Sequence, residues 1–363
     1  MGKAAVKTCL VMAGGTGGHI FPALAVAREL QSRNFHIHWL GSAGGMEEKI
    51  VSQAQIPLSL ISVKGVRGKS GLSRLLAPLM LLRALLQALK VVTKVKPDVV
   101  LGFGGFASAP GGLAAWLTRR PLVIHEQNAV AGLTNKLLAP LAKKVLHAFP
   151  VAFASSEKTK VTGNPVRSLI SDIGSPEERG LGAERKLRLL VLGGSLGATV
   201  INEMVPNAVK AMADEDRPEV IHQCGARHLQ PTLDFYRSCG VTARVEPFID
   251  DMRTVYEWAD FVICRSGAMT VAELALAGVG ALLVPYPHAV DDHQTKNAEY
   301  LAKADAAILI QQNELSPTVI TEILTNLSVD RARLMAMAKN SRQCAYPQAT
   351  NNVADVCEEI ASV

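Results

Sequence analysis

Short apolar runs alternate with longer amphipathic stretches over most of the chain. An apolar run of about four to eight residues bounded by glycine, proline or polar residues is typical of a buried strand. Such runs cover residues 6–13, 36–40, 58–63, 99–103, 122–125 and 144–148 in the first half, and 187–192, 219–223, 243–247, 261–264 and 281–285 in the second. Helical patterns separate most of them, as crossovers between parallel strands require. The pattern predicts an α/β protein with a doubly wound parallel sheet in each half.

The same opening unit occurs twice. The run at 6–13 meets Gly14-Gly15-Thr16-Gly17-Gly18 and a helical pattern at 22–31; the run at 187–192 meets Gly193-Gly194-Ser195-Leu196-Gly197 and a second helical pattern. The length of 363 residues suits two domains. We expect a first domain at 1–166, a second at 167–347, and a helix at about 348–363 that packs back on the first. Because open α/β sheets bind ligands beyond the carboxyl ends of their strands, we expect a cleft between two facing domains.

Composition narrows the classes of partner. The formal net charge is +6, which favours an anionic partner, but aromatic residues are only 5% and do not alternate with the basic ones, so we expect no nucleic acid. The six cysteines form no CxxC pair and indicate reduced core residues. The apolar run near the N-terminus stops at glycine and predicts a first strand instead of a signal peptide, and no segment reaches the apolar length of a membrane span.

Four glycine-containing turns follow predicted strands: 14–18, 102–105, 193–197 and 266–270. Glycine lets backbone N–H groups approach a ligand, and the helix that follows adds partial positive charge, so such turns favour phosphate. A single turn of this kind is about as often only a tight connection. Dinucleotide and P-loop signatures fail, because they would need glycine at Ile20 and Val63. The triplet Asp214-Glu215-Asp216 precedes a strand and predicts a solvated helix end, so we expect no metal site and no cofactor.

The glycine turns are part of a larger ordered set of motifs. In order along the chain, they are Gly14-Gly15-Thr16-Gly17-Gly18-His19-Ile20-Phe21-Pro22-Ala23, Phe103-Gly104-Gly105-Phe106-Ala107-Ser108, His125-Glu126-Gln127-Asn128, Gly163-Asn164-Pro165-Val166-Arg167, Gly193-Gly194-Ser195-Leu196-Gly197-Ala198 and Ser266-Gly267-Ala268-Met269-Thr270-Val271-Ala272-Glu273. Together they resemble the bacterial cell-wall N-acetylglucosaminyltransferases that make lipid II. The resemblance runs from the first strand into the last third of the chain.

The resemblance implies a GT-B fold, meaning two facing Rossmann-like domains. It implies inverting transfer of N-acetylglucosamine from UDP-N-acetylglucosamine to the 4-hydroxyl of the N-acetylmuramoyl unit of lipid I. It also implies a peripheral position on the cytoplasmic face of the inner membrane, with cell-wall synthesis proteins as partners. Both substrates carry pyrophosphate, in agreement with glycine turns in both halves.

The resemblance also implies a set of substrate-binding residues. The set holds the donor phosphates, the ribose diol through Glu273, uracil through the backbone of Ile249 and the sugar hydroxyls through Gln294. It comprises Thr16, Gly17, Gly18, Asn128, Arg167, Ser195, Ile249, Ala268, Met269, Thr270, Val271, Ala272, Glu273 and Gln294. Relatives often carry a second amide before the glutamine; here that position is His293.

An inverting transfer needs a base that removes the acceptor proton. His19 is the candidate, because imidazole titrates near working pH and this residue ends the first glycine turn. The alternative is that His19 only shapes the turn or binds phosphate. Glu126 is the reserve candidate.

A basic, leucine-rich stretch lies between Glu48 and Asp98, with no acidic residue inside it. Helical spacing predicts that Leu72, Leu75, Leu76, Leu79, Leu82, Leu86 and Leu89 face the core, and Met80, Leu81 and Leu85 widen the apolar surface. One interpretation is a well-buried crossover helix with solvated lysines. The other, which we favour, is a patch that meets an anionic membrane surface.

Two rival functions remain open at this point. A UDP-sugar 2-epimerase shares the facing-domain fold and acts without an acceptor. A non-catalytic nucleotide-sugar or lipid-binding protein would bind the donor without turnover.

Overall fold

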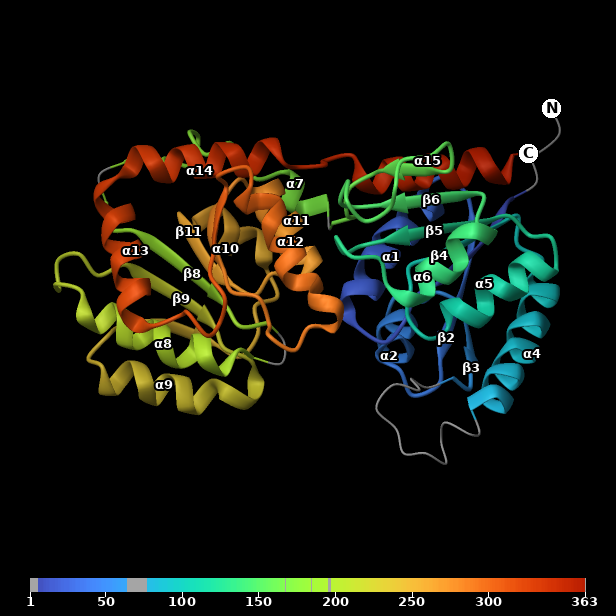
Figure 1. The fold of residues 1–363 in the computed structure, drawn as a ribbon, viewed down its shortest axis with the longest axis horizontal. Helices are drawn as coiled ribbons and strands as arrows, with labels where there is room; N and C mark the ends of the chain where they lie inside the picture. Colours follow the sequence, from blue (N-terminus) through green and yellow to red (C-terminus); the bar gives the residue numbers. More distant parts are fainter. Residues whose placement is uncertain (1–5, 64–76, 167, 184, 195–196, 363) are drawn as a thin grey trace. The chain divides into compact units, whose positions relative to one another are not determined.

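The computed structural model describes residues 6–63, 77–166, 168–183, 185–194 and 197–362. The chain divides into two compact units: unit 1 comprises Met1–Arg167 and Gln348–Val363, and unit 2 comprises Ser168–Pro347 (Figure 1). Each unit contains one parallel sheet flanked by helices. The predicted α/β class is confirmed.

Unit 1 is built on a seven-stranded sheet in the order β3-β2-β1-β4-β5-β6-β7, and all neighbours are parallel. The strands are β1 (Thr8–Met12), β2 (His36–Ser42), β3 (Leu58–Ile61), β4 (Val99–Gly102), β5 (Leu122–Glu126), β6 (Lys144–His147) and β7 (Thr159–Val161). Side chains of β1 alternate between two cores: Cys9 and Val11 lie in one, Leu10 and Met12 in the other. This alternation is the period of an extended strand buried on both faces.

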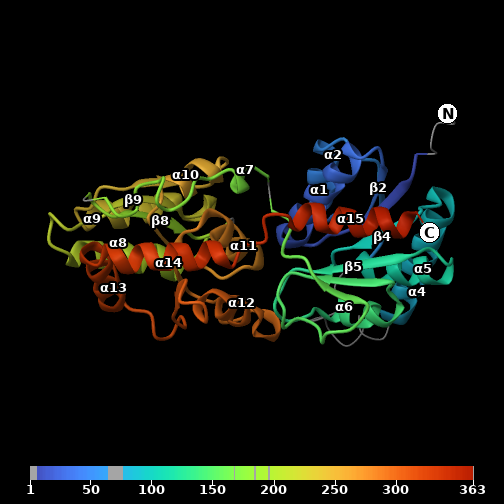
Figure 2. The ribbon, with the colours of Figure 1, turned by 90° about the horizontal axis from the view of Figure 1, so that it is seen from above.

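Helices cover both faces of this sheet. The core around Cys9 and Val11 also receives side chains from α1 (Gly17–Ser32), α2 (Met46–Gln53) and α15 (Ala349–Ala361). The opposite core receives them from α4 (Ala77–Val95), α5 (Ser108–Leu117) and α6 (Leu133–Leu138), which continues into the short η1 (Ala139–Leu141). α15 lies against α1 (Figure 2), and Arg33, just after α1, pairs with Asp355 of α15 at 2.6 Å.

Helix α1 begins at Gly17, although the sequence pattern predicted a start at residue 22. Glycine is a weak helix former, so Gly17 and Gly18 were expected in a loop. The first turn tolerates them because its N–H groups have no partner inside the helix anyway. The backbone N–H groups of His19 and Ile20 both donate to the carbonyl of Thr16, and this closes the first turn.

The predicted orientation of α4 is wrong. Leu79, Leu82 and Leu86 were expected in the core, but they are 66%, 53% and 59% exposed. The fully buried positions are small or β-branched: Ala84, Ala88 and Val92, with Leu85 and Leu89 partly buried beside them. Alanine lets the helix lie close to its neighbours, so the bulkier leucine edge faces outward. Leu72, Leu75 and Leu76 lie outside the described residues.

Unit 2 is built on a six-stranded parallel sheet in the order β10-β9-β8-β11-β12-β13. The strands are β8 (Arg188–Leu192), β9 (Glu219–Gln223), β10 (Arg244–Glu246), β11 (Phe261–Cys264), β12 (Gly280–Leu283) and β13 (Ala307–Leu309). The helices are α7 (Ser168–Ser171), α8 (Thr199–Ala211), α9 (Leu229–Ser238), α10 (Met252–Trp258), α11 (Ala268–Ala277), α12 (His293–Ala302), α13 (Pro317–Val329) and α14 (Arg331–Gln343), with short turns η2 (Ala226–His228) and η3 (Val290–Asp292). Apolar side chains of α8, α9, α13 and α14 share one core.

Two edge strands, β7 and β13, were not predicted from the sequence. Each has only three residues. A run this short at a sheet edge has no periodicity that separates it from a loop. None of the helices in the described part of the chain has the length and apolar character needed to cross a bilayer.

Candidate functional site

The first glycine corner, residues 14–18, joins β1 to α1. Thr16 is extended and caps the helix, so Gly17, Gly18 and His19 form its first turn. The His19 ring lies with Nδ1 3.2 Å from Thr16 Oγ1. A Cβ at Gly104 would lie 3.4 Å from His19 Nε2. The imidazole therefore lies between the first glycine corner and the turn after β4.

A carboxylate lies directly beneath this corner. Glu47 of α2 is fully buried; its Oε2 accepts from the N–H of Gly15 at 3.1 Å and its Oε1 from the N–H and hydroxyl of Ser42, the N–H at 2.8 Å. A Cβ at Gly14 would lie only 2.2 Å from Glu47 Oε1, so any other residue there would have to displace the carboxylate. Burial raises the pKa of Glu47, but the hydrogen bonds from Ser42, Gly15 and its own N–H outweigh it and hold the pKa below 4.5. The charged carboxylate fixes the corner.

The turn after β4 packs closely against the first glycine corner. Gly105 has φ +85°, and a Cβ there would lie 2.3 Å from the backbone oxygen of Gly14. Ser108 at the start of α5 donates to the carbonyls of Gly104 and Met12, at 2.6 and 3.1 Å. The two glycine turns therefore form one packed surface at the carboxyl edge of the unit 1 sheet.

Glu126, the reserve base, is 2% exposed at the end of β5 and binds four donors. Oε1 accepts from the backbone and side-chain nitrogens of Asn128 at 3.0 and 3.3 Å; Oε2 accepts from Gly132 N at 2.9 Å and Asn135 Nδ2 at 2.8 Å. A carboxylate engaged in this way shapes the loop that carries Asn128. Its geometry favours a structural role over proton transfer.

Two further motifs are bound to each other in unit 1. His125 Nε2 donates to the carbonyl of Gly163 at 3.0 Å, and Asn164 Nδ2 donates to the carbonyl of Gln127 at 3.0 Å. Burial lowers the pKa of His125 to about 4, so it is neutral at working pH. These bonds fix the segment that leads to Arg167, which itself lies outside the described residues.

The second glycine corner, residues 193–197, joins β8 to α8 in unit 2. Ser195 lies outside the described residues. Beneath the corner, Asn202 Nδ2 donates to the carbonyl of Cys224 at 3.0 Å, and Asn202 Oδ1 accepts from His222 Nε2 at 3.0 Å. The hydroxyl of Tyr236 lies 2.9 Å from His222 Nδ1. Burial lowers the pKa of His222 to about 3, so the imidazole bound to Asn202 is neutral at working pH.

The turn at residues 266–270 joins β11 to α11, and we call it the donor turn because the resemblance predicts that it binds the donor. Gly267 caps α11, and the helix begins at Ala268, Met269 and Thr270, followed by Val271 and Ala272. Asn297 of α12, fully buried, donates through Nδ2 to the carbonyl of Ser266 at 3.2 Å. Glu273 is partly buried one turn into α11, and its Oε2 accepts from the hydroxyl of Tyr256 at 3.1 Å. The turn therefore presents a helix N-terminus with a carboxylate held in a defined direction.

Ile249 and Gln294, the other predicted donor-binding residues of unit 2, lie in a loop and at the start of a helix. Ile249 is buried just before α10. Gln294 lies at the start of α12, which contacts α11, and its Oε1 accepts from the N–H of Tyr286 at 2.9 Å. His293 directs its Nδ1 to the carbonyl of Val290 at 2.8 Å, which fixes the ring at the start of α12.

Sequence reasoning missed the polar residues that support these turns, namely Glu47, Asn202, Tyr256 and Arg265. Arg265 directly precedes the donor turn and donates to the carbonyls of Val284 and Pro285 at 3.2 and 3.1 Å. A charged residue between an apolar strand and a glycine turn was a signal that could have identified it. The other three resemble ordinary helix residues in the sequence.

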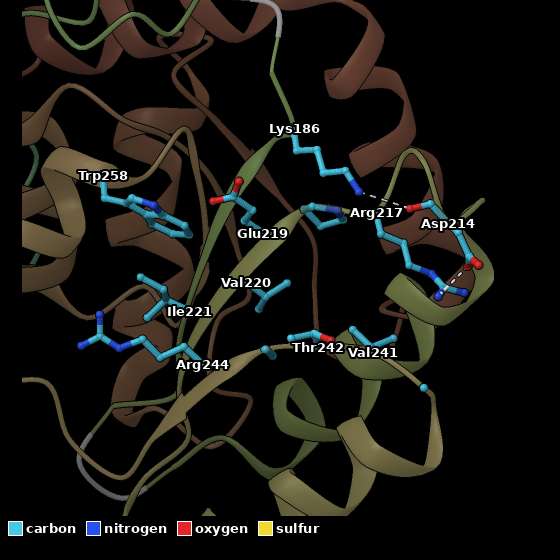
Figure 3. Close-up of a pocket in the computed structure, with 13 residues that line it drawn as sticks. Lys186, Asp214, Arg217, Glu219, Val220, Ile221, Val241, Thr242, Arg244 and Trp258 are labelled. Carbon is cyan, nitrogen blue, oxygen red and sulfur yellow. Dashed lines mark hydrogen bonds and ion pairs between the residues drawn. The ribbon is translucent and has the colours of Figure 1, made fainter.

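The acidic triplet lies far from these turns, at the amino end of the unit 2 sheet, as predicted. Asp214 is 83% exposed, pairs with Arg217 at 2.6 Å, and lies beside Glu219, where β9 begins. It lines a shallow cavity of about 570 Å³ with Lys186, Arg244 and Trp258 (Figure 3). Ligands of parallel sheets bind at the opposite edge, so this cavity is separate from the donor turn.

Comparison with known proteins places both units in one family. Residues 9–147 match the Glycosyltransferase family 28 N-terminal domain, and residues 188–360 match the Glycosyltransferase family 28 C-terminal domain. The chain is 54% identical over 353 residues, 97% of each chain, to a Marinobacter nauticus protein named UDP-N-acetylglucosamine–N-acetylmuramyl-(pentapeptide) pyrophosphoryl-undecaprenol N-acetylglucosamine transferase. A Pseudomonas fluorescens protein of the same name is 52% identical over 353 residues, covering 97% of this chain and 98% of its own.

Solved structures show the same relationship. The crystal structure of Acinetobacter baumannii MurG superposes with a TM-score of 0.86 at 42% identity, covering 97% of this chain and 99% of that one. A UDP-GlcNAc 2-epimerase from Neisseria meningitidis superposes with a TM-score of 0.67 over 98% of this chain and 100% of that one. Its identity is only 14%, so that likeness shows the fold alone.

Proposed function

The chain belongs to glycosyltransferase family 28, and we propose that it is the inverting N-acetylglucosaminyltransferase that makes lipid II. It transfers N-acetylglucosamine from UDP-N-acetylglucosamine to the 4-hydroxyl of the N-acetylmuramoyl unit of lipid I, the pentapeptide pyrophosphoryl-undecaprenol intermediate of peptidoglycan. The names of relatives that are more than half identical over nearly the whole chain support this substrate pair.

The donor turn is the observation that carries the proposal. A glycine-capped helix presents its N-terminal N–H groups at the carboxyl edge of a parallel sheet, where diphosphates bind. Ala268, Met269 and Thr270 hold the donor phosphates, and Glu273 accepts hydrogen bonds from the ribose diol. Val271 and Ala272 belong to the same turn of helix and complete this wall of the site.

The remaining donor contacts follow from the motifs. Ile249 meets uracil through its backbone, and Gln294 contacts the sugar hydroxyls. Ser195 and Arg167 bind phosphate, and the fork of arginine suits a diphosphate because it donates two hydrogen bonds. Asn128, whose loop Glu126 orders, contributes from unit 1.

The reaction is one displacement at the anomeric carbon. His19 takes the proton of the acceptor 4-hydroxyl as its oxygen forms the new bond to C1, and the bond to the UDP oxygen breaks with inversion. Thr16, Gly17 and Gly18 approach the reacting sugar. The charge on departing UDP is stabilised by the N-terminus of α11 and by Arg167. Glu126 remains the reserve base, although its oxygens already accept four hydrogen bonds.

Turnover of a short-chain lipid I analogue tests this function. UDP release and the disaccharide product are followed at saturating donor. We expect His19→Ala to lower turnover by about 10²–10⁴-fold, the usual contribution of a general base, and Glu126→Ala to act mainly through folding stability. Near-normal turnover in His19→Ala would remove His19 from the role. Conversion of the donor without acceptor would favour an epimerase, and binding without turnover a non-catalytic protein.

We also propose that unit 1 meets an anionic membrane surface, because the acceptor is lipid-linked. Leu79, Leu82 and Leu86 form an exposed apolar edge of α4, and exposed Lys90 and Lys94 follow on the same helix. Helix α4 lies beside α5 (Figure 1), whose end carries Trp116, 50% exposed. A cavity of about 790 Å³ next to Trp116 is lined by apolar residues together with Arg119, Arg120, Lys143 and Lys158. Exposed leucines and basic side chains on one unit suit an anionic membrane surface.

Vesicle binding tests the membrane surface. Flotation with anionic phospholipid vesicles should retain the protein, and added salt should weaken binding. Leu82→Ser with Leu86→Ser should weaken it by about tenfold, because two exposed apolar side chains are lost. Val329→Ser, an 83% exposed position in unit 2, is the matched control. Indifference to anionic vesicles would contradict the proposal. The cytoplasmic face of the inner membrane and contacts with cell-wall synthesis proteins belong to the same hypothesis.

A further inference from the structure

Tyr256 is a buried side chain that no motif predicts to have a function. It lies on α10, is 0% exposed, and donates its hydroxyl hydrogen bond to Glu273 Oε2 at 3.1 Å. Burial, and then the Glu273 charge, raise the pKa of Tyr256 well above 10, so the phenol stays protonated and can only donate to this carboxylate. The Glu273 carboxylate is therefore held by a buried donor, the hydroxyl of Tyr256.

The two helices that carry this pair are joined a second time. Arg179 donates through Nη1 to the carbonyls of Tyr256 and Ala259 at 3.0 and 3.3 Å, at the end of α10, and through Nη2 to the carbonyl of Gly278, just after α11. A guanidinium that bridges both helix ends fixes their spacing. Because the spacing is fixed, α10 cannot shift to follow the Glu273 side chain. If that side chain rotated, its hydrogen bond to Tyr256 would break.

We infer that Tyr256 is a positioning residue that aims the Glu273 carboxylate at the ribose of the donor. The inference rests on the proposed function, since it takes Glu273 as the ribose acceptor. A site that hydrogen-bonds a hydroxyl rejects the analogue that lacks it, because the site's polar group is left unmatched. Tyr256 thereby contributes to the preference for a ribonucleoside over a 2′-deoxyribonucleoside diphosphate, although it touches neither.

Calorimetric binding of UDP and 2′-deoxy-UDP tests this role without any acceptor. Tyr256→Phe removes one oxygen and keeps the ring. We expect the preference for UDP to fall by about tenfold, the equivalent of one hydrogen bond to a charged group, while the affinity for 2′-deoxy-UDP changes less than about twofold. Glu273→Ala should abolish the preference, and Tyr256→Phe added to it should change nothing further.

Tyr236→Phe is the matched control. Tyr236 is also a buried phenol of unit 2, but it lies against His222 and not against a donor-site carboxylate. Its removal should leave the UDP preference unchanged even if melting temperature falls. Equal loss in both variants would overturn the positioning role, because it would show a general effect on folding.

The outcomes distinguish the positioning role of Tyr256 from the ribose-binding role of Glu273. Unchanged preference in Tyr256→Phe, with Glu273→Ala behaving as expected, overturns the role of Tyr256 alone. Unchanged preference in Glu273→Ala overturns the ribose site and the inference with it. If Tyr256→Phe does not fold, 3-fluorotyrosine at this position keeps both ring and hydroxyl and strengthens the donor. The preference should then rise, and an unchanged preference would again overturn the role.

Discussion

The first and second glycine corners have nearly the same sequence, yet what lies beneath them differs. Under the first, a buried carboxylate, Glu47, accepts from Gly15, and a Cβ at Gly14 would lie 2.2 Å from it. Under the second, the nearest side chain is a neutral amide: a Cβ at Gly193 would lie 3.2 Å from Asn202 Oδ1 and 3.0 Å from the backbone atoms Ala198 N and Gln223 O. The two corners share a backbone motif, but only the first has a buried carboxylate against it.

From this difference we expect the two corners to favour different ligands. Like charges repel by about 4 kcal/mol at 4 Å and an effective dielectric of about 20, and less at longer range, so a buried carboxylate behind a turn disfavours phosphate there. The first corner therefore suits a neutral sugar hydroxyl, with His19 at hand to receive its proton. The second has no such charge and suits the diphosphate. A glycine turn shows that a backbone can approach a ligand; the residues beneath it determine which charge is tolerated.

The largest expected effect comes from the contact that closes the first corner. Gly105→Ala should lower the free energy of unfolding by about 3–5 kcal/mol, because the new Cβ meets the Gly14 carbonyl and the residue has a positive φ. Urea unfolding followed by circular dichroism measures it. Gly15→Ala is the control. Gly15 has a φ of +88°, but a Cβ built there would have nothing within 4 Å, so the free energy of unfolding should fall by only about 1 kcal/mol. Equal losses would show that backbone conformation alone, and not contact, holds the corner.

Glu47→Gln should lower stability by about 2–3 kcal/mol at pH 7, because an amide puts a donor against the donors that the carboxylate binds. The folded pKa of Glu47 lies below 4.5, so its stabilisation is present above about pH 4.5 and is lost as pH falls through the folded value. The difference in the free energy of unfolding between Glu47→Gln and the parent should therefore disappear in acid. Glu48→Gln, exposed on the same helix, should show little gap at any pH. A gap that persists at pH 3 would contradict a charged Glu47.

Asn202→Ala should weaken UDP binding by about tenfold, or about 1.4 kcal/mol, because the second corner loses its support. Isothermal titration with UDP measures this. Asn207→Ala, on the exposed side of the same helix, is the control and should bind normally. The comparison between corners also requires that Glu47→Gln leave UDP affinity unchanged. Loss of UDP binding in Glu47→Gln would show that both corners hold the diphosphate.

The smallest effect at neutral pH is expected for His222→Gln, within about 1 kcal/mol, because glutamine can still donate to Asn202. The stabilities of the variant and the parent should differ more at acidic pH. The folded pKa of His222 is about 3, below its ordinary 6.5, so the neutral ring stabilises the fold above pH 6.5 and this contribution is lost as pH falls towards 3. Melting temperatures between pH 7 and 4 should fall less steeply in the variant. An unchanged slope, or an equal change in the exposed control His36→Gln, would contradict this assignment.

Much of this architecture could be predicted from the sequence, because buried parallel strands are continuous apolar runs and glycine marks where they turn. Thus β9 and β11 have the predicted bounds. The face of α4 could not be predicted, because leucine and alanine both follow helical spacing and packing distance decides which is buried. The motifs also located the donor turn and His19 on the chain, whereas their roles remain predictions.

The supports of the site could not be predicted for a different reason. Glu47 is 32 residues from the Gly15 that it binds, and Tyr256 is 17 from Glu273. Each lies in an unremarkable helix, and only the fold brings it under a turn. Local pattern predicts where a ligand meets the backbone. Which buried side chain holds that backbone depends on long-range packing.

Helix α15 has a consequence for the order in which the protein matures. Val353, Ala354 and Cys357 are fully buried in the same core as the first strand and α1, although the whole of unit 2 separates them in the chain. On the ribosome, the first part of unit 1 is made before unit 2 but lacks this part of its core until α15 emerges. Unit 2, being continuous, can fold in the meantime. Nascent unit 1 therefore keeps an apolar groove open for most of translation, and chaperones that bind such grooves should associate with it until α15 closes it.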